Sequence, residues 1–137
     1  MTVEDYLDRA TRRRWQWGRV DCTLFCGDWA LAHCGRDPGE GIRGTYSSAD
    51  EAQSIVDRAG GIVAFIGQRL EAIGWERLYY PRLPQEGDIG VIEAPGVPVG
   101  NIMLIPAIRL RDRWVARGIR GLSAGPFNHR AFWRAPC

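Results

Sequence analysis

The sequence predicts an α+β fold in which N-terminal helices pack on a small C-terminal antiparallel β-sheet. Up to about residue 73, apolar residues recur at helical spacing between capping residues and glycines. From residue 89 onward, apolar residues form short runs separated by Gly and Pro, which is the pattern of short strands. Because the helices come first and the strands afterwards, this order favours an antiparallel sheet over the parallel sheet of an α/β fold.

The four predicted helices are bounded by recognisable start and stop residues. Thr2 and Ser48 each precede an acidic residue at the third following position, as in a capping box. Asp21 is a candidate N-cap for the second helix, and Gly35 is a candidate stop. A glycine-rich loop, residues 35–46, separates the second and third helices. The helices are expected at about residues 3–10, 22–35, 48–59 and 62–73, and the strands at 89–92, 102–105, 114–116 and 132–133.

Length and composition predict one domain, residues 1–137. A hydrophobic content of 45% and a charged content of 25% are ordinary for globular proteins. The net charge of +2 is too small to indicate a nucleic-acid partner. No apolar stretch is long enough to span a membrane, and Glu4, Asp5 and Asp8 stand where a signal peptide would be basic. We therefore expect a protein made in the cytoplasm without a signal peptide.

The stretch WGRVDCTLF, residues 17–25, places a cysteine at the start of the second helix. If Asp21 is the N-cap, Cys22 occupies the first helical position. Unpaired backbone N–H groups and the helix dipole favour a thiolate there, so Cys22 is a candidate nucleophile. The alternative is that Cys22 fills the core, as free cysteines commonly do.

The cysteines also raise the question of disulfides and metal. In a reducing compartment, all four cysteines are expected to be free thiols. Cys22 and Cys26 lie one helical turn apart and can chelate from one helix face. His33 and Cys34 lie two to three turns farther along the same helix, and Cys137 contributes only if the chain end returns to them. We therefore expect no metal and no other cofactor.

Beyond these patterns, the chain resembles a known enzyme family. WGRVDCTLF is similar to the nucleophile segment of NlpC-type cell-wall cysteine peptidases, a papain-like family whose Asp-Cys pair opens a helix packed on an antiparallel sheet. EGDIGVI, residues 86–92, resembles that family's Gly-Asp pair before the first sheet strand. The order of W-x-W-G-x-x-D-C, RGTY and AFWR is closer still to small prophage-encoded relatives found with tail-assembly genes. The resemblance implies a papain-like NlpC-type fold, with Cys22 as nucleophile and Asp21 as the orienting helix cap.

One catalytic element of that family is missing. Active NlpC-type enzymes carry a histidine at the start of the next strand, where it takes the thiol proton. The matching stretch here, VPVGNIMLI at residues 97–105, contains no histidine. Pro98, Val99 or Asn101 stands at that place, depending on register, and none of them is a useful base near neutral pH.

Two histidines elsewhere in the chain are alternative candidates for the base. His33 is about three helical turns from Cys22, or roughly 16 Å along the helix axis, and is too far away. His129 precedes the last predicted strand and is a candidate base if that segment folds back toward Cys22. The alternative is that His129 is a surface or capping residue.

Aromatic residues near Cys22 predict a binding groove. Trp15 and Trp17 are candidates for its wall, together with Arg43 and Tyr46 from the glycine-rich loop, whose glycines permit close backbone approach. Such a groove would hold a glycan, a peptide or a neighbouring protein. The alternative for these tryptophans is packing, which is also the interpretation of Trp29 and Trp133.

Two functional hypotheses follow from the resemblance and its missing histidine. The first is a component of a phage or prophage tail tip, built on an NlpC-like scaffold with weak or lost catalysis and partnered by other tail-tip or hub proteins. The second is an active cysteine peptidase or amidase that cleaves peptide bonds of peptidoglycan during phage entry, with the Cys22 N–H in its oxyanion hole. Both imply synthesis in a bacterial cytoplasm and a place in the virion tail, acting at the cell envelope. A metal-binding or redox module built on the cysteines is a third hypothesis.

Overall fold

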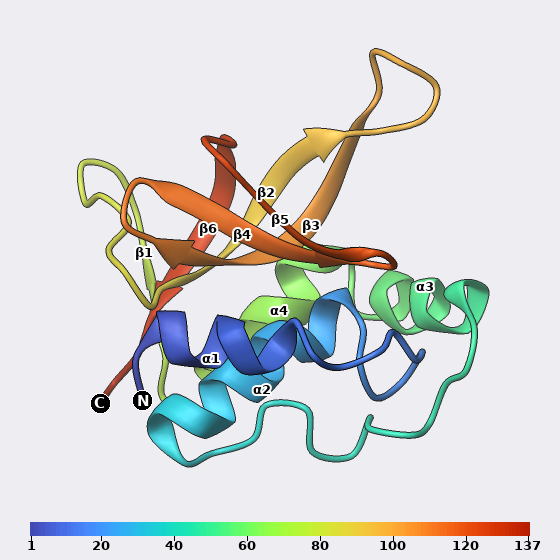
Figure 1. The fold of residues 1–137 in the computed structure, drawn as a ribbon, viewed down its shortest axis with the longest axis horizontal. Helices are drawn as coiled ribbons and strands as arrows, with labels where there is room; N and C mark the ends of the chain where they lie inside the picture. The colour runs from blue at the N-terminus through green and yellow to red at the C-terminus, as the bar shows by residue number, and fades with distance from the viewer.

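The computed structural model describes all residues from Met1 to Cys137 and confirms the predicted α+β class. Four helices come first in the chain and lie together on one face of a six-stranded antiparallel sheet (Figure 1). The helices are α1 (Val3–Ala10), α2 (Cys22–Cys34), α3 (Ala49–Arg58) and α4 (Ile62–Glu71). The strands are β1 (Glu76–Leu78), β2 (Ile89–Pro95), β3 (Ile102–Leu110), β4 (Arg113–Gly118), β5 (Gly121–Gly125) and β6 (His129–Arg134).

The predicted caps explain where the helices begin. The Thr2 hydroxyl accepts a hydrogen bond from the Asp5 N–H at 3.1 Å, and the Ser48 hydroxyl accepts one from the Glu51 N–H at 3.1 Å. Each bond satisfies a backbone donor that the first helical turn leaves unpaired. Gly35 ends α2 in the left-handed conformation, with φ of 78°, where a residue with a Cβ would be strained.

The sheet has the order β1-β6-β2-β3-β4-β5. All four predicted strands are present and extend beyond the predicted runs. The edge strands β1 and β5 were not predicted. Strand β1 has only three residues, and β5 has the sequence GLSAG, which lacks an apolar pattern. Both form because a neighbouring strand offers hydrogen-bond partners, which is a property of the tertiary structure.

Two apolar clusters occupy the two faces of the sheet. Neighbouring residues of a strand face opposite sides, so Val115 packs toward the helices whereas Trp114 points to the outer face. Trp29 and Trp133 are buried in the helix-facing cluster, which confirms that they serve packing. The outer cluster consists of Leu78, Ile92, Ala107, Trp114, Ala116 and Phe132. None of the helices has the length and apolar character that crossing a bilayer requires.

The sheet opens between β3 and β4. Only Ile108–Leu110 of β3 pair with β4, on the partner residues Arg113–Val115. The remainder of β3 stays paired with β2, and the remainder of β4 pairs with β5. The two hairpins therefore diverge, and the β2–β3 hairpin projects from the body of the molecule (Figure 1). This opening lies beside the start of α2.

The prediction of four free thiols is wrong for two of them. Cys34 and Cys137 form a disulfide, with their Cα atoms 5.8 Å apart, whereas Cys22 and Cys26 are free. The segment after β6 returns to the end of α2 and brings together residues that are 103 positions apart in sequence. The prediction of free thiols rested on a reducing compartment alone. It did not take into account that the chain end returns to α2 and places the two sulfurs within bonding distance.

We predict that this disulfide contributes about 2 to 5 kcal/mol to the free energy of unfolding, because it closes a long loop in the unfolded chain. Urea unfolding of oxidised and reduced protein measures the difference. Cys34→Ser should match the reduced wild type, and the stability of Cys22→Ser should still fall on reduction. Equal stability of the oxidised and reduced forms would contradict the prediction.

Candidate functional site

The Asp21-Cys22 pair lies where the sequence predicts it, at the start of α2. Asp21 is the N-cap, and its Oδ1 accepts hydrogen bonds from the N–H groups of Thr23 and Leu24 at 3.1 and 2.9 Å. Cys22 is the first residue of the helix. The geometry expected for a thiol at a helix N-terminus is therefore present.

The second oxygen of Asp21 ties two further segments to this point. Its Oδ2 accepts a hydrogen bond from the Gly18 N–H at 2.9 Å and another from the Tyr46 hydroxyl. The Asp21 side chain is 1% exposed, so these bonds replace all of its contact with water. A buried carboxylate is tolerated when its oxygens are fully paired, and Asp21 accepts four hydrogen bonds. Asp21 thus orients the start of α2, and its oxygens are already engaged.

Cys22 lies between two hollows, which together we call the Cys22 groove. The shared lining residues are Trp17, Cys22, Met103 and Ile105. The larger hollow, about 680 Å³, extends through the opening between β3 and β4 toward Phe127. The smaller hollow, about 420 Å³, extends along α3 and the start of α4. The groove is large enough for an extended peptide or for side chains of a neighbouring protein.

The surroundings of Cys22 oppose ionisation of its thiol. Burial raises the pKa of Cys22, and the negative charge of Asp21 raises it further. The Thr23 hydroxyl, 3.9 Å from the sulfur, lowers the pKa of Cys22, but this effect is smaller than those of burial and Asp21. The thiol is consequently protonated at neutral pH, although the helix N-terminus would favour the anion.

No general base lines the groove. Neither hollow includes a histidine or a glutamate, and Asp21 is the single carboxylate in the lining. Asn101 lies at the exposed turn between β2 and β3, where its amide donates to the Val97 carbonyl. The start of β3 thus offers the Cys22 groove no basic side chain.

His129 does not join Cys22. It begins β6 on the outer face of the sheet, where its ring packs edge-on against Trp114 and Phe132 at centroid distances of 5.8 and 5.1 Å. Burial and the charge of Arg109 lower the pKa of His129. It lines neither hollow of the Cys22 groove. The structure thus places His129 against Trp114 and Phe132, outside the Cys22 groove.

Three of the four predicted groove residues line the Cys22 groove. Trp15 and Trp17 stack edge to face at 4.9 Å and form one wall, and Tyr46 lines the smaller hollow. Arg43 does not line it. Its guanidinium forms ion pairs with Asp28 at 2.6 Å and with Asp37 at 2.8 Å, so the expected binding role is corrected to a structural one.

The Gly-Asp pair before β2 also has a structural explanation. Asp88 is buried and accepts two hydrogen bonds from the Arg134 guanidinium, at 3.0 and 2.8 Å, and one from the Gln85 N–H. This bidentate pair joins the start of β2 to the end of β6. Sequence analysis missed the pair because residues 88 and 134 are far apart in the chain, and only the sheet order brings them together.

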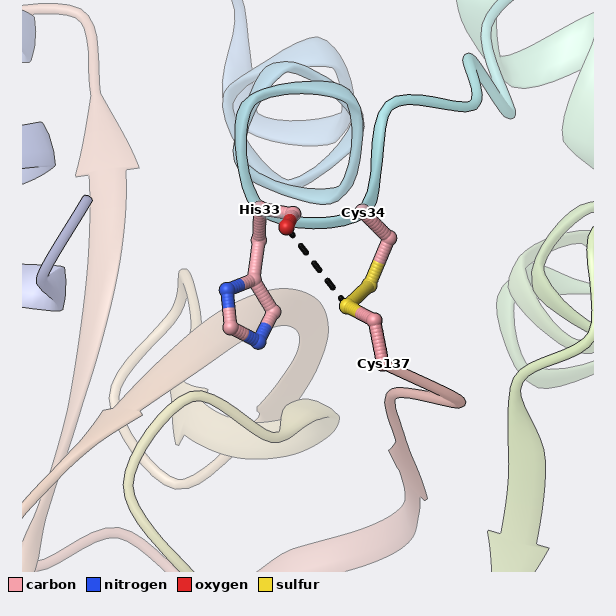
Figure 2. A group of neighbouring side chains, drawn as sticks. All are labelled: His33, Cys34 and Cys137. Atoms are coloured by element: carbon pink, nitrogen blue, oxygen red, sulfur yellow. Dashed lines mark hydrogen bonds between the residues drawn. A yellow bond between two sulfur atoms is a disulfide. The ribbon is translucent and has the colours of Figure 1, made fainter.

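A further set of side chains meets at the end of α2. His33, Cys34 and Cys137 lie together there, although the sulfurs are joined in the disulfide (Figure 2). Cys137 does return to the end of α2, as a metal site that includes His33 and Cys34 would require. Cys22 and Cys26 do not belong to this cluster.

Comparison with known proteins identifies a family for the whole chain. Residues 1–135 match the family described as a domain of unknown function, DUF6950. The chain belongs to this family. No curated protein and no solved structure matches it. Because the DUF6950 description names no activity, the function must be argued from the Cys22 groove itself.

We predict that Asp21 supports the site more strongly than any single partner of its carboxylate. Asp21→Ala removes the helix cap and leaves the Gly18 N–H and Tyr46 hydroxyl unpaired, so it should lower the free energy of unfolding by about 2 to 4 kcal/mol. Tyr46→Phe removes one hydrogen bond and should cost about 1 to 2 kcal/mol. Urea unfolding measures both values.

The double variant tests whether the two residues act together. Since Tyr46 bonds Asp21 directly, Tyr46→Phe should add little once Asp21 is Ala. Fully additive losses would show that the hydroxyl stabilises the fold by another route.

Proposed function

We propose that this chain is a component of a phage or prophage tail tip, built on an NlpC-like scaffold that has lost catalysis. The scaffold part of the proposal is supported by a cysteine that opens a helix packed on an antiparallel sheet, and by Gly87-Asp88 before β2. This arrangement agrees with what the resemblance implies. The tail-tip part is supported by the overall order of motifs, which is similar to that of small tail-associated relatives.

The observation that carries the loss of catalysis is the environment of Cys22. Cysteine peptidases need a thiolate and a base that takes the thiol proton. Here burial and Asp21 raise the pKa of Cys22, and the groove contains no imidazole. A thiol in this setting fills the floor of the groove and has no partner for nucleophilic attack.

An interaction role is supported by the β2–β3 hairpin. Val97 and Val99 at its turn are 95% and 102% exposed. At the start of β3, Ile102 is 59% exposed and Met103 is 50% exposed. The hairpin projects from the body of the domain (Figure 1), and the apolar side chains at its turn are exposed. Exposed apolar clusters of this kind are typical of protein interfaces. Met103 also lines the Cys22 groove, which makes hairpin and groove one continuous surface.

One observation favours the enzyme alternative. Cys22 is half-buried, lines a groove of suitable size, and is the first residue of α2, where its own N–H is not used by the Asp21 cap and suits an oxyanion. A peptidoglycan peptidase or amidase would require a partner to supply the missing base. The experiment below separates the two functions.

We predict that particle assembly depends on the hairpin and is independent of the thiol. The gene is deleted from the prophage that carries it and complemented in turn with wild type, Cys22→Ala and the double variant Val97→Asp/Val99→Asp. Particle yield, tail morphology by electron microscopy and infectivity are measured. Cys22→Ala should restore all three, whereas the hairpin variant should restore none, because charged residues would be buried at the interface.

A matched control keeps the test specific. Glu40→Ala alters a solvent-exposed residue of the glycine-rich loop and should behave as wild type. Loss of infectivity with Cys22→Ala, together with peptidoglycan cleavage by purified wild type alone, would establish the enzyme instead. A gene located outside any prophage, with no effect on particles, would refute the tail-tip proposal.

A further inference from the structure

The cluster at the end of α2 combines three side chains of metal-binding type. His33 and Cys34 are the last residues of α2, and Cys137 lies three residues beyond β6. One imidazole nitrogen of His33 and the two sulfurs lie within 4.8 Å of one another. Figure 2 shows the His33 ring and the sulfur pair directed to the same side of the helix end. No other set of three His, Cys, Asp or Glu side chains in the chain meets in this way.

We propose that this cluster binds a zinc ion when the Cys34–Cys137 disulfide is reduced. The ligands are the His33 imidazole and the thiolates of Cys34 and Cys137, with water in the fourth position. The inference is independent of the tail-tip function, because it rests on residues distant from the Cys22 groove.

The geometry permits this coordination with small movements. Zinc binds thiolates at about 2.3 Å and imidazole at about 2.0 Å, so two sulfurs of a tetrahedral site stand about 3.8 Å apart. One ligand atom from each of the three residues already lies within 4.8 Å of the other two. Cys137 is exposed and follows the exposed Pro136, so its sulfur can retreat from Cys34 without disturbing the core.

The histidine is positioned independently of the disulfide. Its ring stacks on the Trp29 indole at a centroid distance of 4.6 Å and an interplanar angle of 10°. Trp29 is buried and donates a hydrogen bond to the Gly87 carbonyl at 2.9 Å. A fixed indole therefore restricts the His33 ring, and reduction leaves the third ligand where it is. Such restriction lowers the entropic cost of binding.

The two states exclude each other chemically. A dithiol reductant breaks the Cys34–Cys137 S–S bond through a mixed disulfide, supplies two electrons and two protons, and becomes a disulfide itself. Zinc then displaces the two thiol protons and forms two Zn–S bonds. The oxidised protein has no thiolate at this place, so it offers only the imidazole.

Metal titration of the whole chain tests the proposal. Protein is reduced, freed of reductant without oxygen, and titrated with Co²⁺, then with Zn²⁺ against a chromophoric chelator. The reduced wild type should bind one equivalent and show thiolate-to-cobalt charge transfer with the strong d–d bands of tetrahedral cobalt. The oxidised wild type should show neither. Circular dichroism establishes that the reduced chain keeps its fold.

Variants assign the ligands. Cys34→Ser and Cys137→Ser should each reduce the charge-transfer intensity and weaken zinc binding, and His33→Gln should weaken zinc binding by at least about tenfold. His129→Gln is the matched control and should leave zinc binding unchanged, since His129 lies on the outer face of the sheet. Binding that is equal in the oxidised protein, or that persists in both serine variants, would place the metal elsewhere and overturn the proposal. A folded, reduced chain that binds no cobalt would overturn it too.

Discussion

The Asp21 carboxylate joins three parts of the chain: the turn at Gly18, the start of α2 and the glycine-rich loop at Tyr46. One oxygen caps α2, and the other holds the Gly18 N–H before the helix and the Tyr46 hydroxyl from the glycine-rich loop. Because the carboxylate is buried, each of these bonds forms in a poorly screening environment, where an unpaired partner would be costly. Asp21 thus fixes Cys22 at the start of α2 and holds the segment of Trp17 and the loop at Tyr46 beside it.

The same carboxylate limits what Cys22 can do. A helix N-terminus lowers the pKa of a thiol, but a neighbouring negative charge and burial raise it, and here the raising effects prevail. In an active enzyme an imidazole would offset both effects by pairing with the thiolate. Strand β3 instead carries Ile102 and Met103 at its start, next to an exposed apolar turn. The groove thus has a size suited to a peptide or protein, while the pKa of the thiol at its floor is raised.

The sequence predicted local features well and long-range pairings poorly. Caps at Thr2, Asp21 and Ser48 are local signals, and the helices begin where these residues indicate. The buried Asp88–Arg134 pair and the Cys34–Cys137 disulfide depend on sheet order and on the return of the chain after β6, which no local pattern encodes. The glycine-rich loop that contains Arg43 predicts a groove residue there, but two carboxylates, of Asp28 and Asp37, bind its guanidinium and Arg43 does not line the groove.

The alkylation rate of Cys22 as a function of pH tests the account most directly. In the oxidised protein the disulfide protects Cys34 and Cys137, and Cys26 is buried, so peptide mass spectrometry reports Cys22 with an internal control. A synthetic peptide of residues 17–25 supplies the unperturbed rate. The account predicts that Cys22 in the protein is alkylated more slowly than in the peptide at neutral pH. The increase of its alkylation rate with pH should occur at higher pH than in the peptide. Rapid alkylation of Cys22 down to about pH 6 would reveal an activated thiolate and contradict the proposed loss of catalysis.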